Sequence, residues 1–306
     1  MADSITGNFA GEKAAGYIYP ALLSGKTLGE GNVTIHENVA YKLNVRNIEG
    51  TAANFQAAGC DFNDSGDVTI SDVVLTPVDL MINRTLCKQD FRSQWESLEM
   101  RGRMLGQELP TSLLDFFIEK NVSLISAQVE TLLWTGANDA TGNFTGLETR
   151  LAADGTVVDV AIPTDGGGVD IPLSASTIIA QLGRVRDAIS NAVYGKEDLA
   201  IYIPTSIQKF YIAAQAALGY QNLYHDGVTG LNFEGIPLKV APGMSDDKMV
   251  AARAADLHFG TNVMTDMAEV RALDMAELDG SDNVRFIARF SAGTQNTNGA
   301  DIVLFS

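Results

Sequence analysis

The stretch PTSLLDFFIEKNVSLISAQVETLLWTG, residues 110–136, decides the fold that this sequence predicts. Ser112 followed by Asp115 is a variant of the capping box, with Asp in the place of the usual Glu or Gln, and Gly136 is typical of a helix C-terminus. Apolar side chains recur at helical spacing and form a wide stripe: Leu113, Leu114, Phe117, Ile118, Leu124, Ile125, Val129, Leu132 and Leu133. We therefore expect one long helix of about 22 residues and about 33 Å.

Extended segments precede this helix. Residues 1–30 are small, rich in Gly and weakly patterned, and they predict an arm that becomes ordered against something else. Alternating apolar residues between 32 and 48 predict a strand, and the turn signal CDFNDSG at 60–66 is followed by strand-like residues at 68–70, 73–75 and 80–82. A rod that follows a long extended arm favours a building block that reaches its neighbours over an enzyme centred on a pocket.

Strands and helices alternate after the helix. The stretch DGGG at 165–168 predicts a flexible tip, and Ser176 caps an expected amphipathic helix through Val193 that ends at Gly195. A second helix is expected at 207–218. Strands are expected at 157–162, 199–203, 236–241, 249–255, 270–275, 284–290 and 301–305. The sequence therefore predicts an α+β fold without an internal repeat.

Composition narrows the class of protein. The chain has 306 residues, 46% of them hydrophobic, which suffices for a large core. Its formal net charge is −17, and proteins that grip DNA rely on Lys and Arg to neutralise phosphates, so we do not expect it to bind nucleic acid tightly. An acidic surface could line a compartment that holds DNA without adhering to it, but solubility and mutual repulsion are the simpler explanation of the charge alone.

The sequence also bears on the compartment. The first twenty residues lack the pattern of a secretion signal, and no stretch approaches about 18 consecutive apolar residues. We expect a soluble protein that is made in a reducing cytoplasm, with no membrane partner. Cys60 and Cys87 are then expected to be thiols, while their later oxidation in an extracellular particle stays open.

The order of these segments resembles that of the major capsid proteins of tailed bacteriophages with the HK97 fold. The motifs that carry the resemblance are WTG at 134–136 before FTGL at 144–147, FEGIPL at 233–238 with APGM at 241–244, NVMTD at 262–266 and VRALDM at 270–275. The residues at 60–62, 66, 68–70 and 86–91 are similar to capsid proteins of phages that infect Bacteroidota, including the crAss-like phages.

The resemblance implies a division of the chain. It places an N-terminal arm at 1–30, an E-loop hairpin region at 31–95, and a peripheral domain at 96–174 with its spine helix at 111–134. An axial domain at 175–245 and a return of the peripheral domain at 246–306 follow. The arm, the hairpin 60–87 and the tip 165–168 are the regions that we expect to make assembly contacts.

The resemblance also implies a function. Subunits would assemble through pentamers and hexamers into an icosahedral virion shell that encloses double-stranded DNA without reading its sequence. The expected partners are further copies of the chain, a separate scaffolding protein, a portal protein and decoration proteins. No catalytic residue, cofactor site or metal site is expected. An encapsulin-like shell that encloses cargo enzymes has the same fold and is the alternative.

A different class of function comes from Asp61-x-Asn63-x-Ser65-Gly66-x-x-Thr69-x-x-Asp72, which resembles the calcium loop of dockerin modules. Against a calcium-dependent binding module, the loop needs a helix downstream, and residues 73–77 predict a strand. A second copy of the loop is also absent. We expect a polar hairpin turn here.

The three histidines, His36, His225 and His258, are far apart in the sequence, and each is expected to be a surface or structural residue. No nucleophile elbow accompanies them. The stretch at 165–168 lacks the Lys-Ser/Thr that follows in a phosphate-binding loop.

Overall fold

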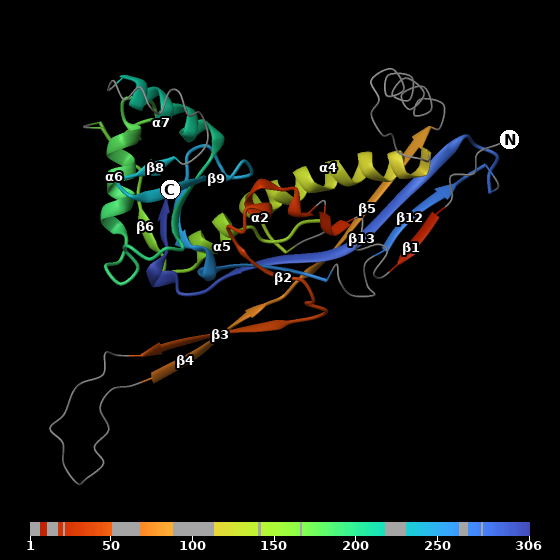
Figure 1. Ribbon diagram of the computed structural model, residues 1–306, viewed down its shortest axis with the longest axis horizontal. Coiled ribbons are helices and arrows are strands. Elements are labelled where there is room, and N and C mark those ends of the chain that lie inside the picture. The colour runs from red at the N-terminus through yellow and green to blue at the C-terminus, as the bar shows by residue number, and fades with distance from the viewer. Residues whose placement is uncertain are drawn as a thin grey trace, which may run out of the picture.

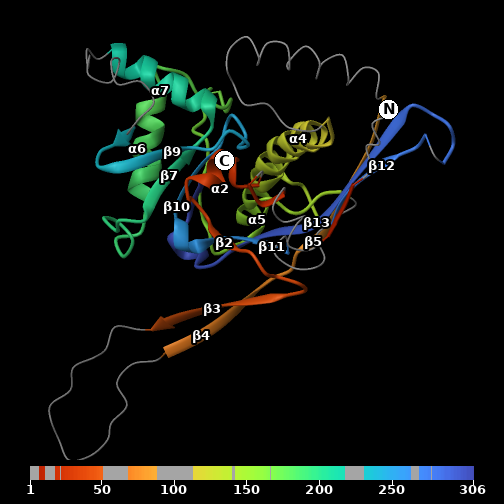
Figure 2. The ribbon, with the colours of Figure 1, turned by 45° about the vertical axis from the view of Figure 1, so that its right-hand side comes forward.

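The computed structural model describes residues 7–10, 18–20, 22–50, 68–87, 113–139, 142–165, 167–217, 231–262, 269–276 and 278–306. These residues form helices, two six-stranded sheets and a two-stranded hairpin, so the α+β prediction is confirmed. Figure 1 shows one long helix lying along the first sheet, the second sheet with its helices at one end, and the hairpin projecting below. Figure 2 shows the same projection from another side.

The long helix is α4, Leu113–Thr135, where the sequence predicted it. Its buried apolar residues follow the helical period: Ile118, Val122, Ile125, Val129 and Leu133. Leu124, which the predicted stripe included, is 45% exposed. Polar Asn121, Ser126 and Glu130 are buried as well, so the face that α4 buries does not coincide with the apolar stripe of the sequence.

Two glycines explain the turn after α4. A Cβ on Gly136 would lie 2.1 Å from the carbonyl oxygen of Phe144, and a Cβ on Gly146 would lie 2.4 Å from that of Trp134. The backbones approach closely enough for the amide of Gly146 to donate to the Gly136 carbonyl at 2.8 Å. The motifs WTG and FTGL are thus two halves of one close backbone contact, which leads into α5, Leu147–Ala153.

The first sheet runs beneath α4. Its strands are β1 (Gly7–Ala10), β12 (Glu269–Asp274), β13 (Asn283–Asn296), β11 (Leu257–Thr261), β2 (Thr34–His36) and β5 (Val78–Cys87), in the order β1-β12-β13-β11-β2, with β5 also paired to β13. The fourteen residues of β13 contact three other strands. Its residues Val284, Phe286, Ala288 and Phe290 alternate with more exposed ones, and together with Ala292 they join the core beneath α4.

The second sheet is covered on both faces. Its strands run in the order β6 (Val158–Val160), β14 (Val303–Phe305), β10 (Met249–Arg253), β7 (Leu199–Ile203), β9 (Ile236–Val240) and β8 (Asn232–Phe233). All five residues of β7 are buried: Ile201 and Ile203 belong to the core with α6 (Ile178–Ala188) and α7 (Thr205–Ala217), while Ala200 and Tyr202 belong to the core with α4. This sheet therefore joins two hydrophobic cores.

Short elements complete the described chain: α2 (Lys26–Gly29), the 3-10 turns η1 (Ala254–Asp256) and η2 (Gly299–Asp301), and the hairpin strands β3 (Leu43–Gly50) and β4 (Val68–Leu75). Helix α5 and strand β11 were not anticipated from the sequence. The second sheet also draws β6, β10 and β14 from outside the range 175–245 that was expected to form the axial domain.

Two expectations differ from the structure. The helix expected to reach Val193 ends at Ala188, because Ser190 starts a turn: its hydroxyl accepts from the amide of Ala192 at 3.3 Å and its carbonyl accepts from that of Tyr194 at 3.0 Å. Part of the expected arm packs on its own chain, since Ile18, Leu22 and Leu28 are buried in the core with α4.

Candidate assembly surfaces

The hairpin has one outward apolar face. Strands β3 and β4 pair antiparallel from Leu43↔Leu75 to Gly50↔Val68. Side chains at alternate positions share a face, so Ile70, Asp72 and Val74 lie together. Ile70 is 59% exposed and Val74 44% exposed, and between them Asp72 accepts a hydrogen bond from Arg46 at 3.0 Å. Exposed apolar residues on a projecting hairpin make this face a candidate contact surface.

The root of the hairpin is fixed to the body. Leu75, at the end of β4, is fully buried, and a Cβ on Gly260 of β11 would lie 2.4 Å from its Cδ2 atom. A Cβ on Gly293 of β13 would lie 2.9 Å from the Thr76 carbonyl oxygen. Further along, the Asn47 side chain donates to the Asn298 side chain. The two glycines let the bend after β4 lie directly against the first sheet, which sets the direction of the hairpin.

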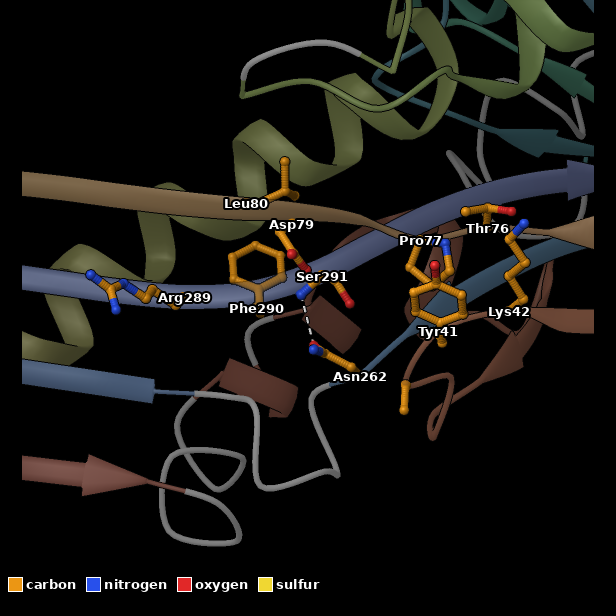
Figure 3. A pocket seen from close by; sticks show the side chains of 11 residues that line it. Tyr41, Lys42, Thr76, Pro77, Asp79, Leu80, Asn262, Arg289, Phe290 and Ser291 are labelled. Carbon is orange, nitrogen blue, oxygen red and sulfur yellow. Dashed lines mark hydrogen bonds between the residues drawn. The ribbon is translucent and has the colours of Figure 1, made fainter.

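A pocket of about 560 Å³ opens at this root (Figure 3). Tyr41 and Lys42 form one side and Thr76 and Pro77 the bend, while the sheet contributes Asp79, Leu80 and the β13 residues Arg289, Phe290 and Ser291. Asn262 holds the floor in place, because its side-chain oxygen accepts from the Ser291 amide at 2.7 Å. The pocket thus combines aromatic, apolar and charged walls on a rigid base.

A buried hydrogen-bond network of Thr27, Glu130 and Trp134, called the latch below, attaches the segment around Thr27 to α4. The carboxylate of Glu130 accepts from the amide of Thr27 at 3.2 and 3.3 Å and from its hydroxyl, and the Thr27 hydroxyl in turn accepts from Trp134 Nε1 at 3.0 Å. The hydroxyl of Tyr202 donates to the Asn32 carbonyl at 2.7 Å. Burial raises the pKa of Glu130, while the hydrogen bonds from Thr27 act in the opposite direction.

The tip at 165–168 is described except for residue 166. The Asp165 carboxylate accepts from the amides of Gly167 at 2.8 Å and Val169 at 3.0 Å, and these hydrogen bonds lower its pKa. Val169 beside it is 65% exposed. The tip is therefore an ordered turn with an exposed apolar residue, and its role in assembly stays a prediction.

Most of the proposed calcium loop, namely Asp61, Asn63, Ser65 and Gly66, lies outside the described residues. Cys60 lies outside them too, so its relation to Cys87 stays a prediction. Thr69 and Asp72 lie in β4, where the EF-hand pattern would place the start of a helix. Among the described residues, no group of three or more His, Cys, Asp or Glu side chains is placed to hold a metal ion.

Two of the three histidines meet. Parallel pairing of β2 with β11 brings His36 Nε2 to 3.2 Å from His258 Nδ1, and His258 Nε2 lies 3.2 Å from the Thr297 hydroxyl. Burial, with a smaller contribution from His36, lowers the pKa of His258 to about 4. His225 lies outside the described residues. No sequence signal could have found this pair, since the register between β2 and β11 creates it.

Within the described part of the chain, no helix is long and apolar enough to span a membrane.

No family model and no curated protein sequence matches this chain. Solved structures do. The procapsid of satellite phage P4 that includes the size determination protein has a TM-score of 0.61 at 11% identity, and the match covers 95% of this chain and 89% of that one. The capsid of the Myoviridae phage XM1 has a TM-score of 0.54 at 12% identity, over 92% and 91% of the two chains. A virus-like particle from Pyrococcus furiosus has a TM-score of 0.50 at 11% identity, over 97% and 99%.

At sequence identities of 11 to 12%, the likeness to these structures shows the fold alone. It extends over nearly the whole of this chain and of each of those chains, so the agreement includes the order of the elements as well as a shared core. The chain therefore has the HK97 fold, which these phage capsid structures share.

Proposed function

We propose that this chain is the major capsid protein of a tailed bacteriophage. In this proposal, copies assemble through pentamers and hexamers into an icosahedral head that encloses double-stranded DNA. The observation that carries the proposal is the hairpin β3–β4: it projects from the body with Ile70 and Val74 exposed, and a neighbouring subunit would cover them.

The domain names of the fold follow as part of the proposal. Helix α4 would be the spine helix, the hairpin the E-loop, and the unit built around α6, α7 and the second sheet the axial domain. The first sheet with α4 would form the peripheral domain. Residues 18–32 would form the inner part of the N-terminal arm, held by Thr27 and Glu130.

The net charge of −17 supports the part of the proposal in which the shell encloses DNA. A shell wall that attracted phosphates would bind the genome as it entered, whereas an acidic wall repels it. A scaffolding protein, a portal and decoration proteins complete the proposed set of partners, with synthesis in the host cytoplasm. The assignment to phages of Bacteroidota, including the crAss-like group, is proposed on the residues of 60–91 alone.

Hairpin variants test the proposal. Ile70→Asp with Val74→Asp places two charges on the outward face, so shell yield is expected to fall by about tenfold or more, while the melting temperature stays near that of the unmodified chain because both sites are exposed. The control is Ser71→Asp, which adds one negative charge at the neighbouring position on the opposite face of β4. Equal yields from all three proteins would contradict the role of the hairpin.

The contents of the particles separate the phage head from the alternative shell. Particles purified from infected cells should contain double-stranded DNA. Particles that contain a cargo enzyme and no genome would favour an encapsulin-like compartment.

A further inference from the structure

The turn between β12 and β13 carries an exposed leucine among acidic residues. Leu278 is 72% exposed. The surrounding sequence DMAELDGSD, residues 274–282, contains four acidic residues and no basic one. Local hydrogen bonds hold the described residues of the turn: the amides of Leu278 and Asp279 donate to the Met275 carbonyl at 3.0 and 2.9 Å, and the Ser281 amide donates to the Asp279 carboxylate at 2.9 Å. A preformed turn loses little conformational freedom when it binds.

The hairpin-root pocket has the complementary character. Tyr41, at its rim, is 80% exposed, and Lys42 Nζ lies 6.0 Å from the centroid of the Tyr41 ring. Pro77 and Phe290 supply apolar walls. Of the charged residues in the lining, Arg289 lies 3.5 Å from the Glu269 carboxylate and Asp79 is negative, so Lys42, exposed beside Tyr41, is the cation that a docking carboxylate could reach. Aromatic and cationic residues around an apolar pocket are the usual composition of a binding hot spot.

One chain cannot join its own turn to its own pocket. Strand β13 connects the two sites. The turn comes directly before Asn283, where β13 begins, and Arg289 to Ser291 of β13 form one wall of the pocket. Six to eight extended residues separate them by about 20 to 26 Å along a paired strand. Figure 1 shows the turn at the far end of the β12–β13 pair, away from the root of the hairpin. The partner for the turn must therefore come from another molecule.

We propose that the β12–β13 turn of one copy docks in the hairpin-root pocket of a second copy, with Leu278 entering between Tyr41 and Pro77 and the turn carboxylates facing Lys42. This inference rests on the proposed function, because it names one contact by which copies would assemble. It is distinct from the outward face of the hairpin. The contact is heterologous, since a turn meets a pocket, and such contacts repeat from copy to copy around a ring.

Cross-linking tests the contact directly. A photo-activatable amino acid at position 278 of the full chain is irradiated at assembly concentration, and mass spectrometry maps the partner residues. We expect links between copies to residues 40–42 and 76–80. The same group at position 124, an exposed leucine of α4, is the control and should give a different map. Links from position 278 only to other regions, or none between copies, would overturn the proposal.

Charge exchange provides a second readout. Lys42→Glu and Asp282→Lys should each weaken association by about tenfold, and the double variant should recover much of the loss because the two new side chains attract each other while Leu278 is kept. Lys42 and Asp282 are both exposed, so folding is expected to survive. No recovery in the double variant would contradict the contact.

The outcomes separate this contact from the proposed function. Shells that form while position 278 links elsewhere would refute the contact and leave the capsid proposal standing. Small oligomers with the expected links, but no shells, would support the contact and count against the capsid proposal. A chain that stays monomeric and gives no links would refute both.

Discussion

The Nε2 atom of His36 lies 3.2 Å from Nδ1 of His258, so two histidines 222 residues apart share one hydrogen bond at the start of the strand pairing between β2 and β11. His258 is 5% exposed, and its second ring nitrogen faces the Thr297 hydroxyl. One neutral imidazole can donate to the other, whereas two protonated rings would repel and lose the shared hydrogen bond.

This pair predicts a loss of stability in acid. The folded-state pKa of His258 is about 4, below its ordinary 6.5, so its neutral form stabilises the fold above pH 6.5 and that contribution is lost as the pH falls toward 4. The difference amounts to about 3 kcal/mol in the free energy of unfolding. Urea denaturation at pH 7.5 and at pH 4.5 measures it. His258→Gln should lose part of this pH dependence, and a variant with the dependence unchanged would contradict the assignment.

Thr27→Val is expected to lower the free energy of unfolding by about 2 kcal/mol, because it leaves the buried Glu130 carboxylate and Trp134 Nε1 without the hydroxyl that serves both. Urea denaturation at neutral pH measures the loss. Thr131→Val is the control: its hydroxyl donates only to the Ala127 carbonyl on the exposed side of α4, so little change is expected. Similar losses in the two variants would contradict the latch.

Gly243→Ala is expected to cost several kcal/mol, about 3 or more, because the new Cβ would lie 2.1 Å from the Glu130 carbonyl oxygen and neither backbone can move freely. Gly183→Ala, within α6, meets nothing within 4 Å and should raise the free energy of unfolding by about 0.5 to 1 kcal/mol through helix propensity. Thermal melts of the two variants give opposite shifts if α4 and the loop after β9 pack as described.

Calcium should leave the melting temperature unchanged. Asp72 lies in β4 and forms an exposed ion pair with Arg46, so Asp72→Asn is expected to cost at most about 0.5 kcal/mol, with or without calcium. Melts with added CaCl₂ and with a chelator test this. A rise in melting temperature with calcium that disappears in Asp61→Ala would restore the calcium-loop hypothesis.

Sequence pattern alone predicted the elements whose burial is periodic. Helix α4 and strand β13 each bury one face, so the periods of Ile118 to Leu133 and of Val284 to Ala292 are visible in the sequence. Strand β7 was predictable because burial on both faces leaves a continuous apolar run. The motifs with Gly136 and Gly146 could be recognised, and the structure adds that their backbones touch.

The remaining features depend on contacts between distant segments. The latch of Thr27 on Glu130 and the pairing of His36 with His258 join residues more than a hundred positions apart, and no local pattern encodes either register. The helix end at Ala188 was missed because the apolar period continues through Ile189 and Val193 while Ser190 starts a turn. The pocket at the hairpin root arises only when residues 40–42, the bend at Thr76 and Pro77, β5 and β13 meet.

The most direct measurement is electron microscopy of the purified full chain, co-expressed with the scaffolding candidates from its own genome. The proposed function predicts closed icosahedral shells of uniform size, or pentamers and hexamers with central openings. A chain that remains monomeric under every condition, with light scattering that agrees, would contradict the claim that it is a capsid subunit.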